Sequence, residues 1–393
     1  MRTRFGLIRM NPRDPSQPNR VASPLELFFD LVFVVSVSLS SSHLHAAEAD
    51  AHIVSGVGSY LMVLLAVWWA WMNFTWFATA FDTDDWFYRL LTIVQMSGAL
   101  VLAAGTGSAM TEGDFTIMTL GYVVMRLPMV AQWLRAAASV RHLRQTALVY
   151  AIGIMIMQML WIARLWLPEQ GGVVSFLVLM GGELAVPIIA ERRRQTPWHP
   201  EHITERYSLF TLILIGESVL ASANAVIDSV EHTAHLPALI IVAVCGLILT
   251  AGMWWTYFAR EHSDSITSFG SSLIFGYGHF VVFAAAGALS AGIEVAIDVD
   301  TNAADITGVA AAATLTVPVS LFLLGTWALT LRHVLSRVTN VVIVTLAVLI
   351  GLSALVPFSL PVAAVCMVAL IAVLEASRNA DRNTRIEQGT MSL

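Results

Sequence analysis

The sequence predicts an all-α protein that crosses a membrane about twelve times, as two parallel repeats of six helices. Composition is the first observation behind this prediction: 57% of the 393 residues are hydrophobic, 12% are charged, and the mean hydropathy is +0.73. Soluble proteins carry about 25% charged residues, so this composition excludes a soluble enzyme, a nucleic-acid-binding protein and a disordered chain. The other two observations are the spacing of the apolar segments and the placement of the arginines.

Twelve apolar segments follow one another along the chain. Most of them approach or exceed the roughly 20 residues that a bilayer-spanning helix needs. They lie at residues 25–45, 53–77, 86–107, 115–134, 146–167, 172–190, 203–226, 236–258, 270–292, 304–331, 340–357 and 359–376. Only Val356-Pro357-Phe358-Ser359-Leu360-Pro361 separates the last two, and its two prolines favour a break over one long helix. The short loops leave no room for a second soluble domain.

The basic residues predict the orientation of these spans. All 21 are arginines, and apart from Arg126 and Arg206 most occur before the first span, after the last span, or in alternate loops and the helix ends beside them. The remaining loops carry Arg164 as their one basic residue and many acidic ones. Since basic residues stay on the cytoplasmic side, we expect both termini in the cytoplasm and therefore an even number of spans. The acidic outer loops would attract cations.

Two halves of the sequence share short patterns. Trp68-Trp69 near the end of the second span matches Trp254-Trp255 in the eighth, and Tyr88 precedes Gly98 by the same ten residues that separate Tyr277 from Gly287. These matches predict a cytoplasmic tail (1–24), a first six-helix repeat (25–190), a cytoplasmic linker (191–202), a second repeat (203–376) and a cytoplasmic tail (377–393). Alternatively, the tryptophans mark only the membrane interfaces.

Charged residues within the spans are the candidate functional residues, because burying a charge in a membrane is costly. Glu26 and Asp30 are four residues apart in the first span, on one helical face. They could bind protons or cations, or they could line an entrance or pair with an arginine.

The seventh span contains a second group. Glu205 and Arg206 lie at its cytoplasmic boundary, and Glu217 lies about 20 Å deeper at 1.5 Å per residue. We expect Gly216 to let a neighbouring helix approach closely. A buried carboxylate at Glu217 suits a proton or cation site, unless a buried base pairs with it permanently.

Further candidates are Arg126 in the fourth span, Glu183 in the sixth and His279 in the ninth. Arg126 could pair with a buried acid. His279 could exchange protons with a carboxylate, or it could form a hydrogen bond between helices. Histidines and acids near His45 and near His232 could bind zinc, but neither set is a complete metal motif. We therefore predict no metal and no cofactor.

Several of these segments resemble the bacterial low-temperature-requirement A family. The residues that carry the resemblance are Ser23 to Val34, Glu205-Arg206-Tyr207, Gly216-Glu217-Ser218, Trp254 to Phe258 and Tyr277-Gly278-His279, and it extends from about residue 20 to 376. The resemblance implies a multi-pass protein of the bacterial cytoplasmic (inner) membrane, and it adds Tyr277 to the candidate site residues. The family is named for growth in the cold, and the resemblance implies no substrate.

Three functions fit these features. The first is a transporter or ion pathway linked to protons or small cations, with the lipid bilayer as its surroundings and no nucleic-acid partner. The second is a membrane-adaptation or scaffold protein without turnover, for growth in the cold. The third is an intramembrane enzyme that modifies lipids, although no nucleophile or metal motif supports it. The sequence leaves the oligomeric state open, with a homodimer among the possibilities.

Overall fold

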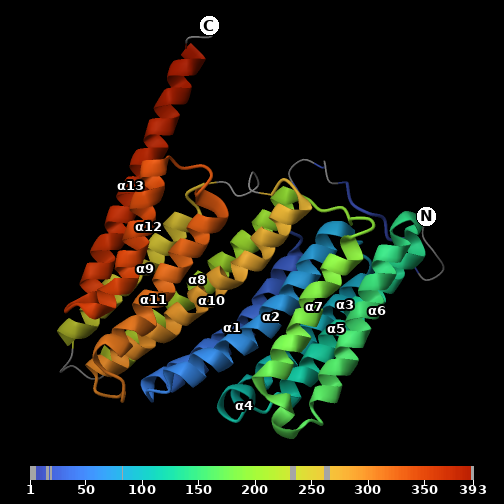
Figure 1. Cartoon of the computed structure of the whole chain (residues 1–393), viewed down its shortest axis with the longest axis horizontal. Helices are drawn as coiled ribbons and strands as arrows, with labels where there is room; N and C mark the ends of the chain where they lie inside the picture. Colours follow the sequence, from blue (N-terminus) through green and yellow to red (C-terminus); the bar gives the residue numbers. More distant parts are fainter. Residues whose placement is uncertain are drawn as a thin grey trace. The chain divides into compact units, whose positions relative to one another are not determined.

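The computed structural model describes residues 6–14, 17, 20–81, 83–230, 236–260 and 266–390 (Figure 1). Within these residues all of the extended regular structure is helical and no β-strand occurs, which confirms the all-α prediction. Eleven of the described helical segments are long and apolar enough to cross a membrane. The protein is therefore a multi-pass membrane protein.

The α-helices follow one another with short connections. Their bounds are α1 Pro24–Ala49, α2 Ile53–Phe81, α3 Trp86–Ala104, α4 Thr106–Thr111, α5 Thr116–Ser139, α6 Arg144–Arg164, α7 Gly172–Glu191, α8 Pro200–Val230, α9 Leu236–Tyr257, α10 Phe269–Asp300, α11 Gly308–Thr326, α12 Arg337–Leu352 and α13 Ser359–Thr390. The short α4 and α8 lie outside the set of eleven spanning segments. Because α8 covers the predicted seventh span, twelve spans stay a prediction.

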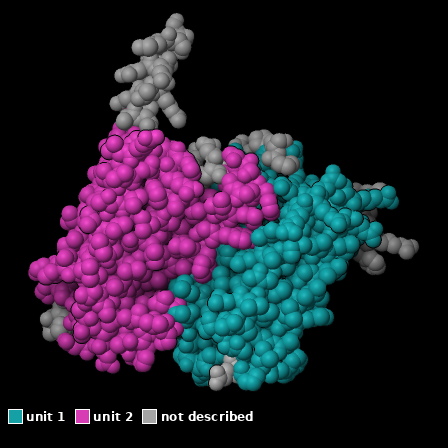
Figure 2. All heavy atoms as spheres, viewed as in Figure 1, with its two compact units in different colours: residues 1–43, 58–206 teal, residues 44–57, 207–393 magenta. Residues whose placement is uncertain are grey.

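The chain divides into two compact units (Figure 2). Unit 1 comprises residues 1–43 and 58–206, and unit 2 comprises residues 44–57 and 207–393. The turn between α1 and α2, with the adjoining ends of both helices, therefore belongs to unit 2.

In unit 1, α3 packs along α5, α5 along α6, and α6 along α7. The contact between α3 and α5 depends on glycine. A Cβ atom on Gly98 would lie 2.6 Å from Cγ of Met125 and 2.8 Å from the carbonyl oxygen of Gly121. Such distances are too short for real Cβ contacts, so the close approach of the two helices excludes any side chain at Gly98.

In unit 2, α10 packs along α11, α11 along α12, α12 along α13, and α13 along α9. At one end of α10 and α11, the buried residues Val295, Ile306 and Ala311 form an apolar cluster that also contacts Ile53 at the start of α2. This cluster holds the α1–α2 turn in place within unit 2.

The ends of α10 and α12 can be compared with the predicted ends of the spans. The break between the last two spans is confirmed, since α12 ends at Leu352 and α13 begins at Ser359. The ninth span is longer than predicted, because α10 continues to Asp300. Ile293, Val295 and Ile297 are buried and extend the apolar face of the helix by more than a turn. Acidic residues that were expected in an outer loop therefore lie on a helix.

Candidate functional site

The first turn of α1 positions two buried carboxylates. The Ser23 N–H donates to Glu26 Oε2 at 2.8 Å, and the Glu26 N–H donates to Ser23 Oγ at 3.3 Å. This reciprocal arrangement is a capping box, which satisfies free N–H groups at the start of a helix. Asp30 follows one turn later on the same face. The residues Glu26 and Asp30 are 2% and 0% exposed.

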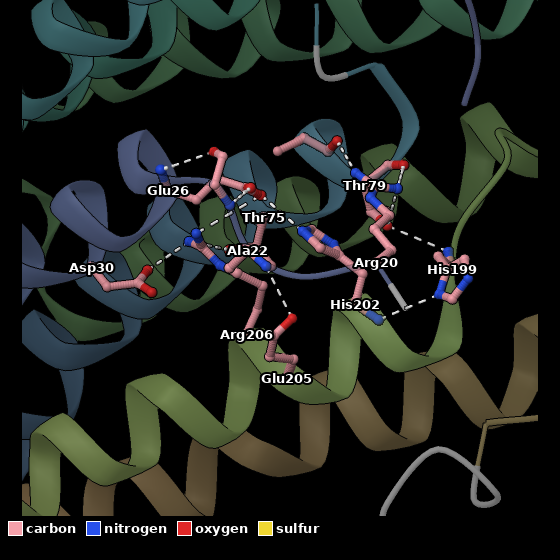
Figure 3. A network of polar contacts seen from close by, with 12 residues as sticks. Arg20, Ala22, Glu26, Asp30, Thr75, Thr79, His199, His202, Glu205 and Arg206 are labelled. Atoms are coloured by element: carbon pink, nitrogen blue, oxygen red, sulfur yellow. Dashed lines mark hydrogen bonds and ion pairs between the residues drawn. The ribbon is translucent and has the colours of Figure 1, made fainter. Parts of the chain in front are cut away.

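Asp30 forms an ion pair with Arg206 of α8. Arg206 Nη2 donates to Asp30 Oδ1 at 2.6 Å (Figure 3), and Trp71 Nε1 of α2 donates to the same oxygen at 2.6 Å. Arg206 is fully buried as well. Of the two alternatives for Asp30, the structure therefore favours pairing with an arginine.

Glu26 has two basic neighbours on α8. His202 Nε2 lies 3.1 Å from Glu26 Oε1, and Arg206 Nη1 lies 3.8 Å from the same atom. His202 is fully buried and was missed in the sequence. Its position four residues before Arg206 was the available signal, because that spacing places both side chains on one face of a helix. We refer to Glu26, Asp30, His202 and Arg206 as the Glu26 network.

Charged groups at the edge of this network bind the backbone. Glu205 accepts the N–H of Ala22 at 3.0 Å. Arg20 donates to the carbonyl oxygens of Thr79 at 2.5 Å and Ala78 at 2.8 Å (Figure 3). Glu205 and Arg20 therefore hold the segment before α1 in place within unit 1.

When both carboxylates of the Glu26 network are ionised, they outnumber its one arginine. The network contains two carboxylates and one arginine, so the histidine decides whether its total charge is neutral or negative. Six buried side-chain atoms of the network make no hydrogen bond among the described residues: Glu26 Oε1, Asp30 Oδ2, His202 Nδ1 and Nε2, and Arg206 Nε and Nη1. Of these, Glu26 Oε1 has ion-pair contacts to His202 Nε2 and Arg206 Nη1. The network therefore has unused donors and acceptors, which are uncommon in protein interiors and call for an explanation such as a functional role. No group of three or more described His, Cys, Asp or Glu residues is arranged to hold a metal ion.

Glu183 and Arg126 form a second buried ion pair in unit 1. Glu183 Oε2 accepts from Arg126 Nη2 at 2.5 Å and from Trp69 Nε1 at 3.0 Å. Gln158 Nε2 donates to the other oxygen, Glu183 Oε1, at 3.1 Å. Since one acid matches one arginine and both carboxylate oxygens are bonded, this pair is balanced.

His279 of α10 is a fully buried residue of unit 2. Its Nδ1 contacts the carbonyl oxygen of Phe275 at 2.7 Å, and its Nε2 contacts the hydroxyl of Tyr257 on α9 at 3.0 Å. A carbonyl only accepts, so Nδ1 carries a proton. The ring also contacts the aromatic rings of Tyr207 and Phe283. Because both nitrogens bond to uncharged groups, the structure favours the hydrogen-bonding role of His279 over proton exchange with an acid.

The model of the bacterial low temperature requirement A protein (LtrA) family matches residues 21–374, most of the chain. The chain belongs to the LtrA family.

A relative of this LtrA-family chain is an uncharacterized protein of Rhizobium meliloti (strain 1021). The two are 27% identical over 295 residues, which cover 68% of each chain. No solved structure matches the chain. The LtrA match begins just before α1 and ends within α13, so it includes both buried ion-pair networks.

The remaining candidate site residues lie in unit 2. Glu217 on α8 and Tyr277 on α10 are both partly exposed. The expectation that Gly216 contacts another helix is wrong, because a Cβ atom there would meet no atom within 4 Å. Asp30 belongs to unit 1, whereas Glu217 and His279 belong to unit 2. The structure therefore brings Glu26, Asp30 and Arg206 together in unit 1, whereas Glu217, Tyr277 and His279 belong to unit 2.

Proposed function

We propose that this LtrA-family protein moves protons or small cations across the bacterial cytoplasmic membrane and that the Glu26 network binds the exchanged proton. The observation that supports the proposal is the unequal charge of this buried network. Glu26 and Asp30 contribute two negative charges when ionised, and Arg206 contributes one positive charge.

An uncompensated charge inside a membrane protein is costly, so a second positive charge stabilises the network. A proton on His202 or on a carboxyl group supplies it, and a small cation near the carboxylates would have the same effect. The network thus has two states that differ by one proton, which is the property that a proton-linked pathway requires.

The Glu183–Arg126 pair has the opposite property. One arginine balances one carboxylate, and both carboxylate oxygens of Glu183 accept hydrogen bonds. The pair gains nothing from an added proton or cation. We assign it to helix packing and not to the pathway.

We also propose the finer architecture that the sequence predicts: both termini in the cytoplasm, and two parallel six-helix repeats. The order of helix contacts supports the repeats, because α3, α5, α6 and α7 follow one another in unit 1 as α10, α11, α12 and α13 do in unit 2. Pro128 within α5 and Pro318 within α11 occupy corresponding helices. In this orientation the Glu26 network lies near the cytoplasmic end of α1.

Proton flux in proteoliposomes tests the proposal. The purified protein is reconstituted with an internal pH-sensitive dye, and a potassium diffusion potential drives proton entry. We expect the wild type to acidify the vesicles and Glu26→Gln and His202→Gln to lose most of this flux, because each removes a proton-binding group. Glu217→Gln is the matched comparison for a partly exposed carboxylate in unit 2.

The outcomes separate the candidate sites. Flux that persists in Glu26→Gln and His202→Gln but disappears in Glu217→Gln would reject the Glu26 network and assign the pathway to Glu217. Equal flux in all variants and in empty vesicles would reject transport of protons under these conditions and favour the second candidate function.

That second candidate is a membrane scaffold without turnover for growth in the cold. The specific observation in its favour is that Asp30 and Glu183 are both paired with arginines in the interior. It predicts that Glu26→Gln and Glu217→Gln fold at wild-type levels and restore growth in the cold to a strain that lacks the gene. Loss of growth with normal folding would contradict it.

A further inference from the structure

A second cluster of titratable residues lies outside the Glu26 network, in unit 2. His45 near the end of α1 lies between Glu294 and Asp298 of α10. His45 Nδ1 is 3.0 Å from Glu294 Oε2, and His45 Nε2 is 2.6 Å from Asp298 Oδ2. The two acids are four residues apart, which places both on one face of α10.

The hydrogen bonds of His45 determine how many protons the cluster holds. An ionised carboxylate only accepts hydrogen bonds, so each ring nitrogen that contacts one must donate a proton. With both nitrogens bonded in this way, His45 is an imidazolium; if a carboxyl group carries the proton instead, the count is unchanged. The three side chains therefore hold one proton more than a neutral imidazole with two carboxylates.

Glu48 adds a third acid, one turn after His45 on α1. It is 4% exposed, and its Oε2 has no hydrogen-bond partner among the described residues. We refer to His45, Glu48, Glu294 and Asp298 as the His45 cluster. Two acids contact the single basic group and a third lies one turn away on α1, so a positive charge on His45 makes this arrangement favourable.

The cluster joins elements that also meet through apolar and backbone contacts. The Asp305 N–H donates to the carbonyl oxygen of Ala49 at 2.8 Å, and Ile53 packs against the buried cluster of Val295 and Ile306. Within unit 2, the α1–α2 turn (residues 44–57) is therefore held by one hydrogen bond, by apolar packing and by the charge of His45.

We propose that the His45 cluster is a proton-binding site that holds the α1–α2 turn on α10 when it is protonated. Loss of the proton leaves a bare ring nitrogen facing a carboxylate, so one contact becomes repulsive and the turn loosens. The side chains of His45, Glu294 and Asp298 keep 23%, 29% and 28% of their exposure, so the protein does not enclose them completely.

Other titratable groups lie on the same elements: Asp50 and His52 in the turn, and Asp300 and Asp305 after or at the end of α10. The three aspartates carry negative charge when ionised, which favours a positive charge on His45, whereas a protonated His52 would oppose it. The site is separate from the Glu26 network, which belongs to unit 1, so the inference does not depend on the proposed transport.

Two measurements on the full-length protein in lipid nanodiscs test the site. The first is ¹⁵N NMR of histidine-labelled protein, with the His45 signals identified by their loss in His45→Gln. We expect two protonated ring nitrogens at acidic pH and one bare nitrogen at alkaline pH. A His45 ring with one bare nitrogen at every pH would overturn the proposal.

The second measurement is hydrogen exchange of the turn, corrected for intrinsic rates with a peptide from α12. We expect exchange in residues 44–57 to rise roughly tenfold over the pH range in which His45 loses its proton, the effect of one charge-assisted hydrogen bond. His45→Gln should abolish this pH dependence, and Glu294→Gln should weaken it. His52→Gln, an exposed histidine in the same turn, is the matched control and should leave it unchanged. The same pH dependence in His45→Gln as in the wild type would overturn the proposal.

Discussion

Arg206 and Asp30 are 176 residues apart in the sequence and 2.6 Å apart in the structure. Their ion pair joins α8 to α1 within unit 1, and both side chains are completely buried. A charge in such surroundings depends on its partner, because removal of one member leaves the other without compensation.

Arg206→Gln should destabilise the protein more than most single substitutions. Breaking a buried pair costs about 3–5 kcal/mol, and we expect the upper end of this range because Asp30 and Glu26 both lose their arginine. Thermal unfolding in detergent, at constant lipid and detergent concentration, measures the loss. In the double variant Asp30→Asn/Arg206→Gln, only Glu26 stays without an arginine, so part of the stability should return. Additive losses in the two single variants would contradict the pairing.

The Glu183–Arg126 pair should be replaceable by apolar residues. Glu183→Leu alone leaves Arg126 unpaired and should cost about 3–5 kcal/mol. The double variant Arg126→Met/Glu183→Leu should recover most of this loss, because well-packed apolar residues often replace buried ion pairs without a net cost. Proton flux in the double variant is the functional check: it should equal that of the wild type if the pair serves packing alone.

Gly98→Ala should weaken the packing of α3 on α5. The added methyl group would lie 2.6 Å from Cγ of Met125, and overpacking of this kind costs about 1–3 kcal/mol. Gly181→Ala in α7 is the control, since a Cβ atom there would meet no atom within 4 Å. In a helix interior this control should be neutral or stabilising by up to about 1 kcal/mol. Equal unfolding temperatures for the two variants would refute the close contact.

Asp85, which precedes α3, should make stability depend on pH. Burial raises the pKa of Asp85, but hydrogen bonds from the Arg135 side chain and from the N–H groups of Tyr88 and Ile8 outweigh this effect and hold the pKa below its ordinary value. The ionised carboxylate therefore stabilises the fold above about pH 3.9, the ordinary pKa of aspartate, and this stabilisation is lost as the pH falls through the lowered pKa.

Unfolding temperatures measured from neutral to acidic pH test this dependence. Asp85→Asn should unfold at a lower temperature than the wild type at neutral pH, and the difference should shrink at the acidic end. Asp84→Asn is the matched control, because Asp84 pairs with Arg89 at the surface, where an ion pair contributes about 0–1 kcal/mol. A constant difference between Asp85→Asn and the wild type across the pH range would contradict the lowered pKa.

Much of the fold could be predicted because the hydropathy of each segment follows directly from the amino acids in it. The break before Ser359 was visible in the two prolines around Phe358, and the all-α class in the length of the apolar segments. The continuation of α10 to Asp300 was not visible. Acidic residues interrupt the apolar run there, while the buried face formed by Val295 and Ile297 continues through it.

The candidate site was predicted only in part. The costs of buried charge identified Glu26, Asp30 and Arg206, which the structure joins in one network. Their pairing was not predictable, since helix periodicity reports which residues share a face of one helix but not which faces meet. His202 was missed because it lies in the predicted linker 191–202, one residue before the predicted seventh span, and the candidates were sought within the spans. The contact between His45 and Asp298 was not predictable because it joins two helices that are distant in sequence.

The membership of residues 44–57 in unit 2 bears on how the gene could be divided. A cut between α7 and α8, within residues 192–199, would leave this turn on the first fragment, while Val295, Ile306 and Asp305, which contact it, would lie on the second. Two fragments produced together from such a divided gene could bind each other through these contacts. The two fragments would then reassemble in the cell through the α1–α2 turn, which belongs to the first fragment and packs against residues of the second.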